Sequence, residues 1–205
     1  MNVILIIVFA ISLIYLSITE RFPVYAGLIG LQGMLLFALS FIELTTITLA
    51  TLLFVALETL VFKVVVVPYF LFRIIHKTGV ARVHDKAVPG FYSLIIVTAG
   101  LLLSIVVAFS MQTAPTAILN FIVALFAVYT GLFLIISHRK IFSHLVGFLV
   151  IENAVLLLSM AIGSQMPMLI NIGILLDIFV SVLILGIFVM RLKGHASELT
   201  QLKDD

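Results

Sequence analysis

Long apolar runs separated by short polar segments dominate the chain, and their lengths are the first indication of its structure. A helix needs about 20 mostly apolar residues to cross a bilayer. The candidate segments are Val3–Ile18, Tyr25–Ile42, Thr45–Ile75, Phe91–Met111, Thr116–Ser137, His144–Ile162 and Met168–Met190. This pattern predicts an all-α membrane protein with seven transmembrane helices.

The third segment is longer than a straight span requires. Thr45–Ile75 contains 31 residues. As an α-helix these would extend about 46 Å, against a hydrocarbon core of about 30 Å. The helix must therefore tilt, protrude or bend. Pro68 predicts a bend, because proline removes one backbone donor and crowds the carbonyl of Val64.

The basic residues predict the orientation of the helices. Lys and Arg follow the first, third, fifth and seventh segments, and the other connections carry none. These residues are Arg21, Arg73, Lys77, Arg82, Lys86, Arg139, Lys140, Arg191 and Lys193. Because cytoplasmic loops are enriched in Lys and Arg, we expect the N-terminus outside and the C-terminus in the cytoplasm. The first segment lacks a basic n-region and a cleavage site, which indicates a retained span rather than a signal peptide.

Composition narrows the class further. Hydrophobic residues make up 64% of the chain and charged residues 10%, which excludes an ordinary soluble domain. The formal net charge of +2 does not suggest a nucleic-acid partner. The absence of cysteine excludes disulfides, thiolate zinc sites and iron–sulfur ligation by this chain. We therefore expect no metal and no cofactor bound by the chain itself.

Several ionisable residues nevertheless interrupt the apolar segments. Glu58, Lys63, Glu152 and Asp177 lie within them, and Glu43 and His144 lie nearer their ends. A charge near the middle of a bilayer costs several kcal/mol, so such residues usually mark ion or proton paths. The alternative hypothesis is that they hold helices together as buried polar contacts.

The two acids of the last two segments suit a proton relay. Glu152 and Asp177 lie about 14 Å and about 21 Å from the cytoplasmic ends of their helices. A low-dielectric surrounding disfavours the charged form of a carboxyl group, so each acid can hold a proton near neutral pH and pass it on through water. Asn153 and Asn171 can orient such waters, although interhelical amide hydrogen bonds are the simpler interpretation of each.

Lys63 needs a partner of its own. Glu58 and Lys63 are five residues apart, which places them about 140° apart around an α-helix, so they are not expected to pair. Two hypotheses remain for the lysine. Either it alternates between charged and neutral forms, or an acid of a neighbouring subunit neutralises it.

The segment Arg73–Pro89 is the only sizeable connection, and it contains His76, His84 and Asp85. Two histidines and an aspartate can hold a metal ion. A solvated basic loop that touches lipid headgroups or a partner is the interpretation that we favour.

A shift of about 120 residues aligns the chain with itself. Gly27 then falls on Gly147, Gln32 on Glu152 and Gly33 on Asn153. The expected orientations agree, which predicts two parallel three-helix units joined by an extra helix. The first unit comprises residues 1–75 and the second unit residues 112–193. Between them lie a basic loop, residues 76–90, and a connecting helix, residues 91–111. A polar cytoplasmic tail, residues 194–205, follows the second unit.

The segment SHLVGFLVIENAVLLL, followed by a helix centred on Asp177, resembles the E component of hydrogenase-4 and formate hydrogenlyase complexes. The C-terminal half of that family is similar to the K subunit of respiratory complex I and to the C subunit of multisubunit sodium/proton antiporters. Glu152, followed by Asn153 and Ala154–Leu157, matches the intramembrane glutamate on the second helix of the K subunit. Asp177 stands where a second glutamate would be. In this chain Asn153 directly follows the acid, the second acid is an aspartate, and the hairpin is shorter.

The resemblance implies a proton-conducting subunit in a prokaryotic inner (plasma) membrane, without a catalytic site of its own. The partners would be antiporter-like and channel-type membrane subunits and a peripheral hydrogenase arm, which would carry the nickel–iron and iron–sulfur centres. The expected proton path comprises Glu152, Asp177, Glu58 and Lys63. The expected supporting polar residues are Gln32, Asn153, Asn171 and His144.

Two alternatives stay open. The chain could serve a cation/proton antiporter that has no redox module, or it could be a structural scaffold. A haem-binding protein is disfavoured, because His144, close to a cytoplasmic edge, is the only histidine that falls within a predicted span. A stand-alone transporter would usually have inverted repeats and broken helices.

Overall fold

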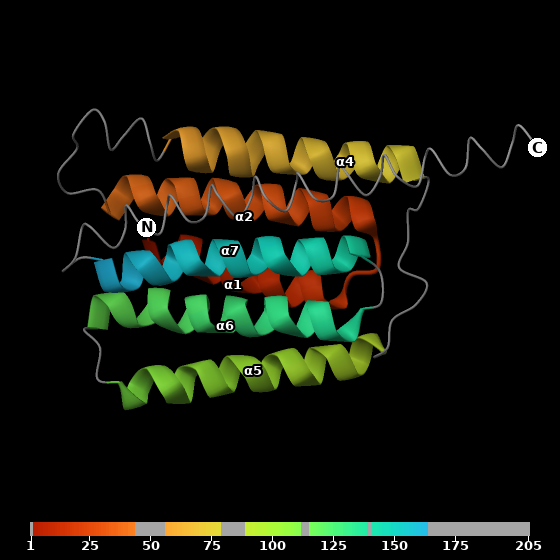
Figure 1. Cartoon of the computed structure of the whole chain (residues 1–205). Coiled ribbons are helices and arrows are strands. Elements are labelled where there is room, and N and C mark those ends of the chain that lie inside the picture. Colours follow the sequence, from red (N-terminus) through yellow and green to blue (C-terminus); the bar gives the residue numbers. More distant parts are fainter. Residues whose placement is uncertain (1, 44–55, 79–88, 112–114, 139–140, 164–205) are drawn as a thin grey trace, which may run out of the picture.

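The computed structural model describes residues 2–43, 56–78, 89–111, 115–138 and 141–163. These residues form a bundle of helices lying side by side (Figure 1). The helices are α1 (Asn2–Ile18), α2 (Phe22–Glu43), η1 (Ala56–Val66), α4 (Val67–Thr78), α5 (Gly90–Ser110), α6 (Pro115–Ser137) and α7 (Ile141–Gly163). The described chain is thus helical, as the sequence predicts.

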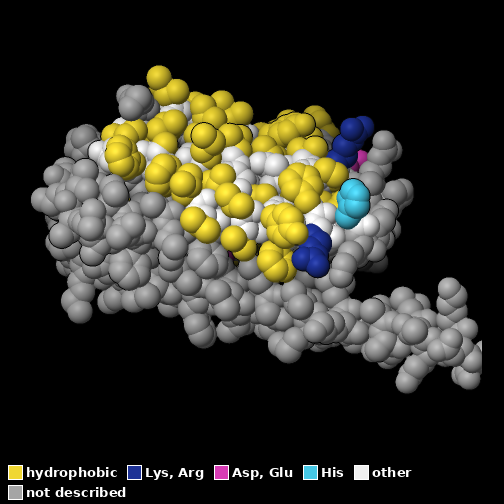
Figure 2. Space-filling model, turned by 90° about the horizontal axis from the view of Figure 1, so that it is seen from above, with side chains coloured by type: hydrophobic (Ala, Val, Ile, Leu, Met, Phe, Trp, Pro, Cys, Tyr) yellow, Lys and Arg dark blue, Asp and Glu magenta, His cyan; other side chains and the backbone are white. Residues whose placement is uncertain are grey.

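Four of these helices are long and apolar enough to cross a membrane. They contain the spans Phe22–Ile42, Gly90–Ser110, Ile118–Ser137 and Phe142–Ile162, and the shorter Asn2–Ile18 is apolar as well. Apolar side chains also spread over the outer face in Figure 2. The chain is a multi-pass membrane protein. The predicted segment Met168–Met190 lies outside the described residues.

Successive helices alternate in direction along the bundle (Figure 1). The turn between α1 and α2, the end of α4, the start of α5 and the turn between α6 and α7 all lie at one end of the bundle. Arg21 and Arg73 belong to this end. Figure 2 shows basic and histidine side chains gathered there. α4 extends to Thr78, so the first residues of the predicted loop Arg73–Pro89 are helical.

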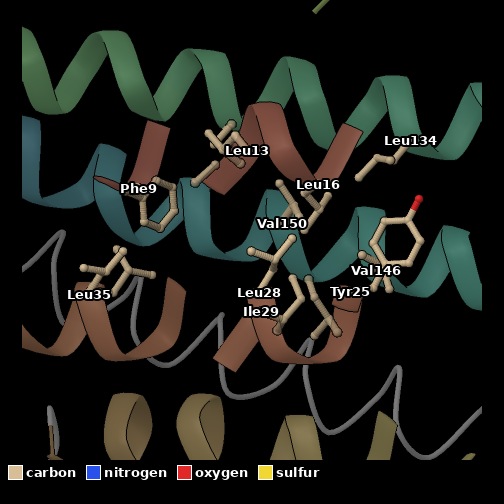
Figure 3. Close-up of a cluster of buried hydrophobic side chains, with 14 of the residues drawn as sticks. Phe9, Leu13, Leu16, Tyr25, Leu28, Ile29, Leu35, Leu134, Val146 and Val150 are labelled. Carbon is tan, nitrogen blue, oxygen red and sulfur yellow. The ribbon is translucent and has the colours of Figure 1, made fainter. Parts of the chain in front are cut away.

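The centre of the bundle is a continuous apolar core contributed by α1, α2, α6 and α7 (Figure 3). α2 contacts α1, η1, α4 and α7, whereas α5 packs mainly on α6 and α1. The side chains labelled in Figure 3 are Phe9, Leu13, Leu16, Tyr25, Leu28, Ile29, Leu35, Leu134, Val146 and Val150. α2 therefore occupies a central position, from which it contacts both the first and the last described helix.

Glycine sets the closest approach between α6 and α7. A Cβ atom added at Gly131 would lie 2.7 Å from the carbonyl oxygen of Gly147, and one added at Gly147 would lie 2.8 Å from the carbonyl oxygen of Gly131. Small residues allow membrane helices to approach closely. The two glycines form the α6–α7 seam, with Ile151 and Ile135 packed over them.

Glycine also brings η1 and α4 onto α2. A Cβ atom at Gly33 would lie 2.8 Å from Cβ of Lys63, and one at Gly30 would lie 3.0 Å from Cγ of Pro68. We call this contact, made by Gly30 and Gly33 with Lys63 and Pro68, the α2–η1 seam. It fixes the backbone of η1 against the central helix.

The described part of the long third segment changes its winding just before Pro68. η1 is a π-helix over Ala56–Val66, and α-helical turns resume at Val67, one residue before the proline. Figure 1 shows η1 and α4 as one continuous rod. Wide turns hydrogen-bond residue i to residue i+5. The change of helical pitch therefore falls next to Pro68, which has no backbone donor.

The helix bounds can be compared with the predicted repeat. A shift of about 120 residues maps the bounds of α2 onto those of α7 to within one residue. α2 and α7 also run in the same direction through the bundle (Figure 1).

Candidate functional site: a buried polar chain

Lys63 is buried in the bundle, with 4% of its surface exposed. Its backbone lies on Gly33 of α2, where a larger residue would collide with it. Its Nζ atom donates a hydrogen bond of 3.0 Å to Oδ1 of Asn153 on α7. The lysine is thus held between α2 and α7, and its bonding partner Asn153 lies 90 residues away in sequence.

The hydrogen bond from Lys63 is the first link of a longer chain. Nδ2 of Asn153 donates to Oε1 of Gln32 over 3.2 Å, and Nε2 of Gln32 donates to Oγ of Ser12 over 3.0 Å. Oγ of Ser12 in turn donates to the carbonyl oxygen of Phe9 over 2.6 Å. We call Lys63, Asn153, Gln32, Ser12 and the Phe9 carbonyl the polar chain. It crosses the bundle from η1 through α7 and α2 to α1.

Ser12, Gln32 and Asn153 each lie on a helix whose buried residues are mostly apolar. Ser12 belongs to the inner face of α1, which also carries Phe9, Leu13 and Leu16. Gln32 has no exposed surface, because α2 is covered on several sides by its neighbours. Buried polar groups that lack partners cost free energy, so the chain satisfies the side chains that the packing has removed from lipid.

Glu152 lies beside the polar chain on α7. It directly precedes Asn153 and is buried, with 6% of its surface exposed. A carboxyl group and an amine are therefore both enclosed in an apolar bundle, on helices that the polar chain links. Charged groups inside membrane proteins usually mark ion or proton pathways.

Lys63 has a hydrogen-bond partner within its own chain, and the hypothesis that an acid of a neighbouring subunit neutralises it stays a prediction. The hydrogen-bond acceptor comes from α7 of the same chain, because Gly33 lets η1 approach α2 closely enough for the amine to reach Asn153. The interpretation of Asn153 as an interhelical amide contact is confirmed, since its carboxamide bonds residues of two other helices.

The angle expected between Glu58 and Lys63 is wrong. It was derived for α-helical winding, but both residues lie in the π-helix Ala56–Val66. Residues five apart are hydrogen-bonded neighbours along a π-helix. The two backbone positions therefore lie nearer to one face than an α-helix would place them.

A second polar cluster lies at the end of the bundle that carries Arg21 and Arg73. The hydroxyl of Tyr25 donates to the carbonyl of Thr19 over 3.0 Å and lies 3.4 Å from Nε2 of His138. Nε2 of His144 lies 2.6 Å from the carbonyl oxygen of His138. The predicted supporting residue His144 therefore belongs to this turn and not to the polar chain.

Sequence reasoning missed Ser12, Tyr25 and His138. Ser12 and Gln32 lie on the two helices that the turn between α1 and α2 joins, and membership of one hairpin is the signal that could have brought them together. Tyr25 and His138 give no comparable signal, because the turn regions they occupy are joined only by the fold.

Several residues of the predicted site lie outside the described part of the chain. Asp177 and Asn171 fall outside the described residues, as do His84 and Asp85, and the side chains of Glu43 and Glu58 are not described. Within the described ranges, no group of three His, Asp or Glu residues could hold a metal ion.

Comparison with known proteins shows a similarity at low identity. No protein-family model matches the chain, and no solved structure matches it. The chain is similar to the uncharacterized protein Rv0085 of Mycobacterium tuberculosis, with 25% identity over 148 residues. The match covers 69% of this chain and 66% of that relative, so it spans slightly less than two thirds of the relative's length.

Proposed function

We propose that the chain is a proton-conducting membrane subunit of a complex I-like, membrane-bound nickel–iron hydrogenase assembly. The observation that carries the proposal is the burial of Lys63 and Glu152 in an apolar helical bundle. Keeping an acid and an amine there is costly unless they are used. Glu152 supplies a carboxyl group that can take up and release a proton.

The proposal includes the finer topology. The chain would cross the membrane seven times, with the N-terminus outside and the end that carries Arg21 and Arg73 in the cytoplasm. The distribution of Lys and Arg in the sequence supports this orientation. A prokaryotic inner membrane is the expected location.

The run from Glu152 to Leu157 supports the choice of assembly, because it resembles the K subunit of complex I and the E component of hydrogenase-4. In this proposal the chain carries protons beside antiporter-like and channel-type subunits. The nickel–iron and iron–sulfur centres belong to partner subunits. Asp177 and Glu58 would continue the path from Glu152, and Asn171 would orient water along it.

A structural scaffold is the second candidate, and the polar chain favours it. Three consecutive interhelical hydrogen bonds connect four helices, and bonds of this kind contribute about 0.6 kcal/mol each. In that case Lys63 and Asn153 hold the bundle together and take no part in proton transfer. An antiporter subunit would share the proton path and differ only in its partners.

The decisive experiment separates carriage of a proton from hydrogen bonding. Glu152→Gln keeps the size and the hydrogen-bonding capacity of the side chain but cannot carry a proton. In the assembled complex in sealed vesicles, we expect this variant to lower proton translocation about a hundredfold while the amount of complex is unchanged. Ser143→Ala, at a buried position of the same helix, is the control and should translocate protons normally.

The scaffold predicts the opposite pattern. Proton translocation would survive Glu152→Gln, and Asn153→Leu would reduce the amount of assembled complex. Subunits that co-purify with the chain then choose between the assemblies: a nickel–iron large subunit supports the hydrogenase, and antiporter subunits alone support the antiporter.

A further inference from the structure

The polar chain has a direction, which follows from the chemistry of its two ends. At one end the carbonyl oxygen of Phe9 can only accept a hydrogen bond, so the hydroxyl of Ser12 must donate to it. A hydroxyl has one proton to donate. Oγ of Ser12 must therefore accept from the next group, and it does so from Nε2 of Gln32.

The same logic fixes the two carboxamides. With its nitrogen committed to Ser12, Gln32 presents Oε1 to its other neighbour and accepts from Nδ2 of Asn153. Asn153 then presents Oδ1 to Lys63. Turning the Asn153 carboxamide over would set its NH₂ group against the amine of Lys63 and its oxygen against the oxygen of Gln32. Two hydrogen bonds would be lost together.

The fixed direction makes Oδ1 of Asn153 a strong acceptor. An amide that donates through its nitrogen becomes a better acceptor at its oxygen, because hydrogen bonds in a series polarise one another in a low-dielectric surrounding. A hydrogen bond made to the charged form of a group favours that form. The acceptor offered to Lys63 is thus determined three links away, by a backbone carbonyl of α1.

We propose that Ser12, Gln32 and Asn153 are positioning residues that hold Lys63 as a fixed cation, rather than as a carrier that gives up its proton. The inference rests on the proposed function only for the use of that cation, which would provide a stationary positive charge beside the proton carried by Glu152. Lys63 is then a part of the site that does not exchange its proton.

The test measures the protonation of Lys63 without measuring transport. The full chain in native membranes is treated with acetic anhydride, which acetylates amines only in their neutral form, over a series of pH values. Mass spectrometry gives the acetylation rate of Lys63 relative to the other lysines. The critical variant is Ser12→Ala, which removes one hydroxyl and leaves the apolar contacts of α1 in place.

Ser17→Ala is the matched control. Ser17 is also buried on α1, and its hydroxyl donates to the carbonyl of Ile14, three residues earlier, as Ser12 does to Phe9. We expect Ser12→Ala to move the acetylation–pH curve of Lys63 to lower pH, with a rate at neutral pH about threefold to tenfold higher. Ser17→Ala should leave the curve in place.

Two further variants grade the effect. Asn153→Leu should move the curve further than Ser12→Ala, and Asn153→Asp, which retains an oxygen facing Lys63 and adds a negative charge, should move it the other way. If Asn153→Leu does not fold, the curves of Ser12→Ala and Asn153→Asp still test whether the polar chain sets the protonation of Lys63. The inference is overturned by an unchanged curve in Ser12→Ala, by equal shifts in Ser12→Ala and Ser17→Ala, or by a rate that rises equally at every pH, which would report access alone. Loss of the proposed function would appear separately, as normal proton translocation in Glu152→Gln.

Discussion

Glycine allows two helix backbones to approach closely at both the α6–α7 seam and the α2–η1 seam, but the contacts that result differ. At the first, Gly131 and Gly147 bring two backbones together and isoleucine side chains close over them. At the second, Gly33 brings the backbone of Lys63 onto α2, and the side chain goes on to bond α7. Close backbone approach thus gives an apolar contact in one place and positions a buried amine in the other.

The difference teaches where the stability of the bundle resides. The α6–α7 seam consists of apolar atoms and backbone on both sides, and its packing cannot relax without separating two helices. The α2–η1 seam lies at the side of the bundle and depends partly on hydrogen bonds, which contribute little each in a membrane. We expect substitutions at the first seam to cost more stability and substitutions at the second to affect the site.

The largest effect is expected from Gly147→Ala. The new Cβ atom would lie 2.7 Å from Cγ1 of Ile135 and 2.8 Å from the carbonyl oxygen of Gly131, and the latter cannot move without its helix. We expect the free energy of unfolding to fall by about 2–3 kcal/mol, measured by denaturant titration of the protein in detergent.

Gly27→Ala is the control for this substitution. Gly27 occupies the position equivalent to Gly147 in the predicted repeat, but a Cβ atom there would meet nothing within 4 Å. Replacing a helical glycine by alanine in open space should raise stability by up to about 1 kcal/mol. Equal losses at the two positions would contradict the contrast between the two helices.

Asn153→Leu is expected to have the next largest effect. It removes both interhelical hydrogen bonds of the carboxamide, to Lys63 and to Gln32, and keeps a side chain of similar size. The expected cost is about 1–2 kcal/mol. A loss larger than that of Gly147→Ala would show that the polar chain, and not the α6–α7 seam, holds the bundle together.

The sequence predicted the helices well, because the bilayer imposes the length of a span and leaves it visible as an apolar run. The described helices begin and end within a few residues of the predicted segments, except that the start of Thr45–Ile75 and the whole of Met168–Met190 lie outside the described residues. It also identified Lys63, Glu152, Asn153 and Gln32, since a polar residue in such a run is conspicuous.

What the sequence could not give is which of these residues meet. Membrane helices are apolar on most sides, so hydropathy does not indicate which helices are neighbours, and the contact between Lys63 and Asn153 depends on α7 lying beside α2. The winding of η1 was equally hidden, since the expected angle between Glu58 and Lys63 assumed an α-helix.

Gly33→Ala should produce a smaller loss of stability than the preceding variants. The new Cβ atom would lie 2.8 Å from Cβ of Lys63 and 3.0 Å from its carbonyl carbon. η1 can shift outward, so we expect a cost of about 1 kcal/mol. The shift should also weaken the bond between Lys63 and Asn153, and higher acetylation of Lys63 would report it. Unchanged acetylation would show that the side chain reaches Asn153 independently of the seam.

The smallest effect is expected from Tyr25→Phe, which tests a link between the two hairpins that belongs to neither seam. The substitution removes the hydrogen bond of 3.0 Å to the carbonyl of Thr19 and the contact with His138. The expected loss is about 0.5 kcal/mol, at the low end of what one hydrogen bond contributes, measured in the same titration. Phe22 and Phe142, whose ring centroids lie 4.4 Å apart, should keep the turns together, and separation of the turns in this variant would contradict that.

The winding of η1 has a consequence for how this helix tolerates change. In an α-helix, positions that accept substitution recur about every 3.6 residues, whereas i to i+5 hydrogen bonding lengthens the repeat. In a complete substitution scan from Ala56 to Thr78, the spacing between tolerant positions should therefore be longer up to Val66 and about 3.6 residues beyond it. The residue at which this spacing changes would locate the change of helical pitch in the protein as it exists in a living cell.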